Sequence, residues 1–235
     1  MKFVIDKQVF EKLPGIIFGV VVAHVDNRIE NPDISKLLLH WVEARREELE
    51  KHNLKDHPDI LPYREAFAAL SMNPNKYMCS IEALCKRVQK GNGLPSINPV
   101  VDIGNAVSLK YMLPIGAHDL DKINADFAVR FSVSNDLFTP FGSDRPETPE
   151  PGELIYVSGN TVKTRRWIWR QSEDGKIEET SSHILFPIDG FETCLERVTA
   201  ARDELCALIH KHFGVSAEAG LLNSKNREMT LQDID

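Results

Sequence analysis

Two neighbouring stretches of the sequence concentrate polar side chains that can bind or orient small molecules. Asn98 and Asn105 lie in the first stretch, and His118 and Asp119 lie in the second. Amide groups position a substrate or a water molecule, and a histidine or a carboxylate can orient water as a general base. The alternative is structural, because asparagine and aspartate often cap helices and a histidine beside aspartates is often a packing partner. The spacing of these residues does not match a metal site, so we expect none.

The stretch RRWIWRQ, residues 165–171, places cations and indole rings together. In a strand its side chains alternate between two faces, and neither face is purely apolar. Trp167 and Trp169 are expected either to wall a pocket or to fill the core. Arg166 and Arg170 are expected to donate hydrogen bonds to polar groups of a ligand, unless they pair with glutamates of the same chain. The candidate glutamates are Glu153, Glu178 and Glu179.

The composition is that of an ordinary globular protein. The chain has 235 residues, of which 42% are hydrophobic and 27% are charged, so it can form one large domain or two small ones. It contains no leader-like segment and no apolar run of membrane length, so we expect a cytoplasmic protein without a membrane partner. The net charge of −7 argues against a protein coated in nucleic acid, although residues 85–91 and 163–171 are locally basic.

The sequence lacks the common motifs of cofactor chemistry. It contains no GxGxxG after a strand, no GxxxxGK[ST], no HExxH and no GxSxG. Dinucleotide enzymes, P-loop enzymes, zincins and α/β-hydrolases therefore lack support, and we expect no cofactor. The four cysteines have no CxxC spacing, so neither a zinc site nor a disulfide framework is indicated.

The hydrophobic periodicity predicts an α+β fold. The expected helices are residues 34–52, 61–71, 80–91, 100–113 and 192–213, and the expected strands are residues 2–6, 16–25, 127–134, 153–157, 160–171 and 183–190. Because helices come mostly first and strands mostly second, we expect one domain, residues 1–220, with a mixed β-sheet packed with helices. Asp33 is expected to cap the first helix, and residues 221–235 are expected to be a polar, partly disordered tail.

A longer run resembles a known family. Residues 93–123, GLPSINPVVDIGNAVSLKYMLPIGAHDLDKI, are similar to the B3/B4 editing region of the phenylalanyl-tRNA synthetase β subunit. Free-standing B3/B4 proteins resemble the chain further, in YREAF (63–67), NPNKY (73–77), residues 80–91 and RRWIWRQ. The core of this resemblance lies within residues 60–190. It implies a B3/B4-like fold and hydrolysis, in trans and without metal, of the ester of a mischarged aminoacyl-tRNA, which is translation quality control with tRNA as the partner.

The chain departs from the synthetase pattern in two places. His118 stands where the synthetase has phenylalanine, two positions after its histidine, and residues 166–171 replace a wall of small residues. Tyrosine specificity is therefore not carried over. We expect His118, Asp119 and Asn105 to act in catalysis. The residues expected to bind substrate are Asn98, Arg166, Trp167, Trp169, Arg170, Gln171 and Thr180.

Two other functions stay open. The fold can serve as a non-catalytic tRNA-binding or RNA-binding module that has lost the groups that orient water. It can also bind or hydrolyse free amino acids or small acylated metabolites, a function with which the acidic overall charge is compatible. A deacylation assay with mischarged tRNAs and a binding assay with amino acids alone separate the three functions.

Overall fold

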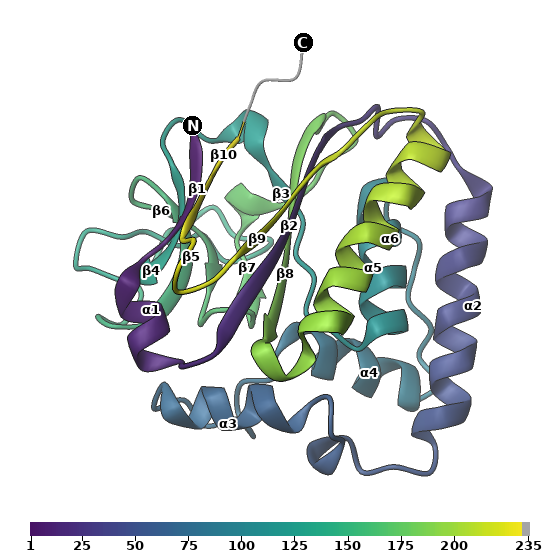
Figure 1. The fold of residues 1–235 in the computed structure, drawn as a ribbon, viewed down its shortest axis with the longest axis horizontal. Coiled ribbons are helices and arrows are strands. Elements are labelled where there is room, and N and C mark those ends of the chain that lie inside the picture. Colours follow the sequence, from purple (N-terminus) through teal and green to yellow (C-terminus); the bar gives the residue numbers. More distant parts are fainter. Residues whose placement is uncertain (232–235) are drawn as a thin grey trace.

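The computed structural model describes residues 1–231, and within them the strands form two sheets (Figure 1). The larger sheet has the order β10 (Glu228–Thr230), β1 (Lys2–Ile5), β4 (Phe127–Phe131), β5 (Leu154–Ser158), β6 (Thr161–Arg165) and β7 (Arg170–Gln171). The smaller sheet has the order β3 (His118–Asp119), β8 (His183–Phe191), β2 (Ile16–His24) and β9 (Glu218–Leu222). Only the pair β1–β4 is parallel, so the larger sheet is mixed and the smaller one antiparallel.

Helices cover one face of the smaller sheet. The α-helices of the described residues, in chain order, are α1 (Lys7–Lys12), α2 (Pro32–Leu49), α3 (Leu61–Ala69), α4 (Ser80–Gln89), α5 (Pro99–Tyr111) and α6 (Leu195–Phe213), and only some of them pack on this sheet. Helix α6 packs on β2 and β8, α5 packs beside α6, and α2 lies outside against α5 (Figure 1). No helix of residues 1–231 is long and apolar enough to cross a bilayer.

Strand β2 of the smaller sheet is covered by helices on one face and by the larger sheet on the other, which gives the fold three layers. Its residues Ile17 and Val21 face the helices, together with Val198 and Leu205 of α6. Its residues Phe18, Val20 and Val22 face the larger sheet, in one cluster with Phe3, Phe127 and Tyr156. A strand buried on both faces needs an unbroken apolar sequence, and residues 16–23 of β2, IIFGVVVA, supply it.

The α+β fold class is confirmed, with four differences from the sequence analysis. The strands form two sheets instead of one mixed sheet. The cap of α2 is Asn31, whose side chain accepts from two backbone N–H groups, and not Asp33. Residues 221–222 end β9 and residues 228–230 form β10, which pairs with β1, so this part of the expected tail is ordered by the sheets. The remaining expected tail, residues 232–235, lies outside the described residues.

The fourth difference concerns the RRWIWRQ stretch, which is not one strand. Strand β6 ends at Arg165, the next four residues form a turn, and β7 begins at Arg170. Arg166 and Trp167 adopt φ values of 50° and 60°, a left-handed conformation that side chains other than glycine seldom take. The backbone N–H of Trp167 donates to the backbone carbonyl of Leu154 at 2.5 Å, and this bond holds the turn against β5.

Candidate functional site

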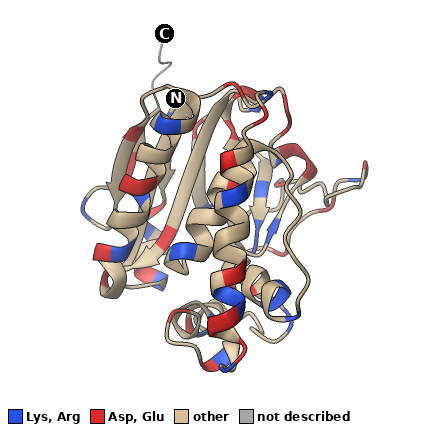
Figure 2. Cartoon of the chain, turned by 90° about the vertical axis from the view of Figure 1, so that its right-hand side faces the viewer, with Lys and Arg blue, Asp and Glu red and all other residues tan. Residues whose placement is uncertain are grey.

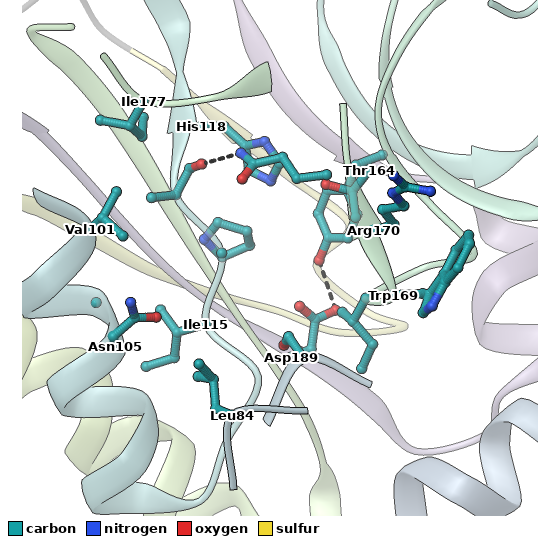
Figure 3. A pocket seen from close by; sticks show the side chains of 18 of the residues that line it. Leu84, Val101, Asn105, Ile115, His118, Thr164, Trp169, Arg170, Ile177 and Asp189 are labelled. Carbon is teal, nitrogen blue, oxygen red and sulfur yellow. Dashed lines mark hydrogen bonds between the residues drawn. The ribbon is translucent and has the colours of Figure 1, made fainter. Parts of the chain in front are cut away.

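A cavity of about 330 Å³ opens between α4, α5, the segment around β3, and strands β5 to β8 (Figure 3). Apolar side chains form most of its walls. They include Ala83, Leu84, Val101, Ile115, Ile168, Ile177 and Pro187. This mixture of apolar walls and a few polar groups is typical of a small-molecule binding site.

Asp189 of β8 is the carboxylate of this cavity (Figure 3). Its side chain is buried, and Oδ1 accepts from Tyr156 Oη at 2.7 Å and from Trp167 Nε1 at 2.6 Å. Its backbone carbonyl accepts from Tyr63 Oη at 2.9 Å. Burial raises the pKa of Asp189 to about 7, and the two donated hydrogen bonds only partly oppose that rise.

His118 of β3 also lines the cavity, with its ring stacked on Tyr156 at a centroid distance of 5.5 Å. Its Nδ1 is buried without a hydrogen-bond partner. Burial, helped by the charge of Lys163, lowers the pKa of His118 to about 3. The ring is therefore neutral at pH 7 and a weak base, but a neutral imidazole can still orient a water molecule.

Arg170, Trp169, Gln171 and Asn105 complete the polar and aromatic lining. Arg170 is exposed beside the Trp169 ring, 5.9 Å from its centroid, and no carboxylate of residues 1–231 forms an ion pair with it. The amide of Gln171 donates to the carbonyl of Ala117 at 2.8 Å. The amide of Asn105 makes no hydrogen bond to another described residue, so it is available to a ligand or to water.

Five of the ten expected site residues lie outside the cavity lining, and three of them, Asn98, Asp119 and Thr180, make contacts away from it. Asn98 caps α5, where its Oδ1 accepts from the Val101 N–H at 3.0 Å. Asp119 accepts from Ser181 Oγ at 2.6 Å and from the Asp121 N–H at 3.0 Å, outside the cavity lining. Thr180 is exposed and borders a separate hollow with residues 25–28. We therefore leave these three out of the proposed site.

Arg165 and Arg166 are buried and face internal carboxylates. The Arg165 guanidinium donates twice to Glu153 at 2.8 Å and also bonds Glu147. Arg166 lies 3.0 Å from Glu153 and stacks over the Tyr77 ring, 4.3 Å from its centroid. The structural alternative, pairing with a glutamate of the same chain, therefore describes Arg166, and Arg165 shares the same partner, Glu153.

The tryptophans divide between the two alternatives. Trp167 is fully buried in the core and lies outside the cavity lining, although its indole N–H reaches Asp189. Trp169 is half-buried, lines the cavity and meets Tyr77 edge-on.

Four polar residues of the lining were not expected from the sequence: Ser80, Tyr156, Thr164 and Asp189. A signal existed for Asp189, because it is a carboxylate inside HILFPIDGF, an otherwise apolar strand apart from its first histidine. A charged residue in a buried strand requires partners, and this is a reason to suspect a site. No comparable signal marks the other three.

Comparison with known proteins decides the family. The sequence model of the B3/4 domain family matches residues 62–214 of this chain. The chain belongs to the B3/4 domain family. Every residue that lines the cavity, from Ser80 to Asp189, falls within the matched part of this B3/4 domain.

Solved structures also resemble this B3/4 chain, and one of them is a synthetase fragment. It is an N-terminal fragment of the phenylalanyl-tRNA synthetase β-subunit from Pyrococcus horikoshii, at 10% sequence identity and a TM-score of 0.48. The match covers 94% of this chain and 54% of the fragment, so the chain spans about half the length of that structure. No curated protein sequence matches the chain significantly.

Proposed function

We propose that this B3/4 domain hydrolyses the ester bond of an aminoacylated tRNA in trans, removing a wrongly attached amino acid. The observation that carries the proposal is the convergence of neutral His118, the free amide of Asn105 and unpaired Arg170 on one apolar cavity. An aminoacyl ester is already activated. Its hydrolysis needs an oriented water molecule and donors for the developing oxyanion, rather than a covalent intermediate.

The cavity provides a place for each part of the substrate. Its apolar walls fit an amino-acid side chain, and Trp169 offers an aromatic face for the terminal adenine. Arg170 is the donor for a phosphate or for the acyl carbonyl. His118 Nε2 orients the water whose oxygen bonds to the acyl carbon, and the Asn105 side-chain amide positions the substrate from another wall of the cavity. The ester C–O bond then breaks, and the ribose hydroxyl leaves with a proton from that water.

Helix α4 offers further contacts for the RNA backbone. Ala83 and Leu84 of α4 line the cavity, and Arg87 follows Leu84 by about one turn. Lys86, Arg87 and Lys90 are exposed, and none forms an ion pair within residues 1–231. The face that carries α2 differs, because cations and anions alternate along it (Figure 2). We therefore assign tRNA binding to the side with α4 and Arg170.

A deacylation screen tests the proposal. Folded protein in excess is mixed with a panel of labelled, mischarged aminoacyl-tRNAs in the presence of chelator and without ATP. We expect at least one ester to be hydrolysed well above its rate in buffer. Decay of every aminoacyl-tRNA at the buffer rate, while the protein still binds tRNA, would favour a non-catalytic RNA-binding module.

A second candidate function is the binding or hydrolysis of a free amino acid or a small acylated metabolite. It is favoured by the pairing of Arg165 and Arg166 with Glu153, which removes two cations from any RNA surface. A cavity of about 330 Å³ also lies at the small end of ligand sites, as a free amino acid requires. A rise in melting temperature with amino acids alone, and no effect of tRNA, would support it.

A further inference from the structure

The charge of Asp189 is not explained by the fold. Both side-chain hydrogen bonds that it accepts go to Oδ1, from the neutral groups of Tyr156 and Trp167. No lysine, arginine or histidine of residues 1–231 forms an ion pair with it. A buried carboxylate without a cation is unfavourable, and an asparagine oxygen would accept the same two bonds without a charge.

The surroundings of Asp189 fit a positively charged group better than they fit an empty site. Asp189 Oδ1 accepts hydrogen bonds from Tyr156 and Trp167, whereas Oδ2 makes no hydrogen bond to any described residue. The Tyr156 ring, whose hydroxyl donates to Oδ1, stacks on the His118 ring, and both rings line the same cavity as Asp189. Aromatic faces attract cations, and a desolvated carboxylate forms strong bonds with an ammonium.

We infer that Asp189 binds the protonated amino group of the ligand, so that the cavity accepts an aminoacyl group whose α-amine is free and rejects one whose α-amine is acylated. This inference rests on the proposed function for its aminoacyl substrate. The ligand then has its ammonium at Asp189, its side chain against the apolar walls, and its phosphate-bearing end at Arg170. The ammonium of such a ligand gives Asp189 the paired cation that no residue of 1–231 supplies.

Non-hydrolysable ligands test the inference apart from catalysis. The probes are 3′-deoxyadenosines that carry leucine or phenylalanine through a 3′-amide, each with a free α-amine or with an N-acetylated one. Calorimetry should show that the wild-type protein binds the free-amine form about 30-fold or more tightly than the acetylated form, as for a buried charge pair. In Asp189→Asn, which keeps the acceptor for Tyr156 and Trp167, the two forms should bind within about threefold of each other.

Tyr156→Phe is the matched control. It removes one hydrogen bond to Asp189 but retains the carboxylate, so the preference for the free amine should persist. If Asp189→Asn does not fold, the wild-type protein and Tyr156→Phe still decide the question. Equal affinity for the free and acetylated forms in the wild type would overturn the inference, and so would a preference that survives in folded Asp189→Asn. Failure of every probe to bind the wild type at millimolar concentration would overturn it as well.

The inference and the proposed function fail in different ways. Selective binding of the free-amine probes, with every aminoacyl-tRNA decaying at the buffer rate, would keep the ammonium site and refute the hydrolase. Equal hydrolysis of aminoacyl-tRNA and N-acetylaminoacyl-tRNA would keep the hydrolase and refute the ammonium site.

Discussion

Replacing Asp189 by asparagine should make the protein more stable at neutral and alkaline pH. The wild-type carboxylate loses its proton there and becomes a buried charge without a cation. Asparagine has nearly the same shape, accepts the same two hydrogen bonds and carries no charge. The variant therefore avoids a cost that the wild-type protein bears only when Asp189 is ionised.

The size of this effect follows from the pKa of Asp189, which burial raises from 3.8 to about 7. A shift of about 3 units corresponds to about 4 kcal/mol, since each unit is about 1.4 kcal/mol. Between these two pKa values the folded state holds a proton that the unfolded state has released, so the stability contributed by protonated Asp189 falls as pH rises. About 3 kcal/mol of the change should fall between pH 5 and pH 8.

Neighbouring titratable groups do not alter the sign. Burial raises the pKa of Tyr63 and of Tyr156 well above 10, so both phenols stay neutral over this range. His118, with its pKa lowered to about 3, gives stability that is lost as pH falls below about 6.5. This opposite trend is present in both proteins, so it cancels to first order when the two are compared at each pH.

The assay is urea unfolding of both proteins at pH 5, 6, 7 and 8, followed by tryptophan fluorescence. The free energy of unfolding of Asp189→Asn, relative to the wild type, should increase by about 3 kcal/mol from pH 5 to pH 8. Asp144→Asn removes the same charge from an exposed loop and should change the difference by less than about 0.5 kcal/mol. A difference for Asp189→Asn that stays constant across the range would refute the assignment of a buried, unpaired carboxylate.

Two further predictions concern the arginines and the histidine. Arg170→Ala should leave the free energy of unfolding within about 0.5 kcal/mol of the wild type, and it should flatten the dependence of log K for tRNA on log salt by about one unit. Arg165→Ala should lower the free energy of unfolding by about 3 kcal/mol, because it breaks the buried pair with Glu153. Equal salt slopes for Arg170→Ala and the wild type would show that the cation does not meet phosphate. His118→Ala should lower the single-turnover rate about 10²-fold and leave tRNA affinity within a few-fold, and normal turnover would remove His118 from the chemistry.

Most of the fold could be predicted from local patterns. The helices α2 to α6 and the strands β1, β2, β4, β5 and β8 lie where periodicity and turn residues indicate them. Five of the expected site residues also line the cavity. Polar and aromatic residues that a hydrophobic core does not require can be recognised in the sequence, and this pattern indicated a site. These five are Asn105, His118, Trp169, Arg170 and Gln171.

Long-range contacts explain what the sequence analysis missed. The donors to Asp189 lie 33 and 22 residues away along the chain, on β5 and in the turn after β6, and no local pattern connects them. The same holds for Glu153, which pairs with Arg165 across 12 residues. Whether a charged residue forms a buried ion pair or stays unpaired depends on such contacts and not on its neighbours in sequence.

The turn between β6 and β7 links the interior of the cavity to its rim. A strand through RRWIWRQ would place Trp167 and Trp169 on one face, but the left-handed residues Arg166 and Trp167 separate them. Each left-handed residue costs roughly 1–2 kcal/mol, and the bonds of Trp167 to Asp189 and of Arg166 to Glu153 offset this cost. Because one turn holds the indole against Asp189 and carries Trp169 to the cavity wall, the same four residues position two parts of the cavity lining. The strain and the site thus have a common origin, which accounts for a sequence that fits neither a core strand nor a solvent-exposed one.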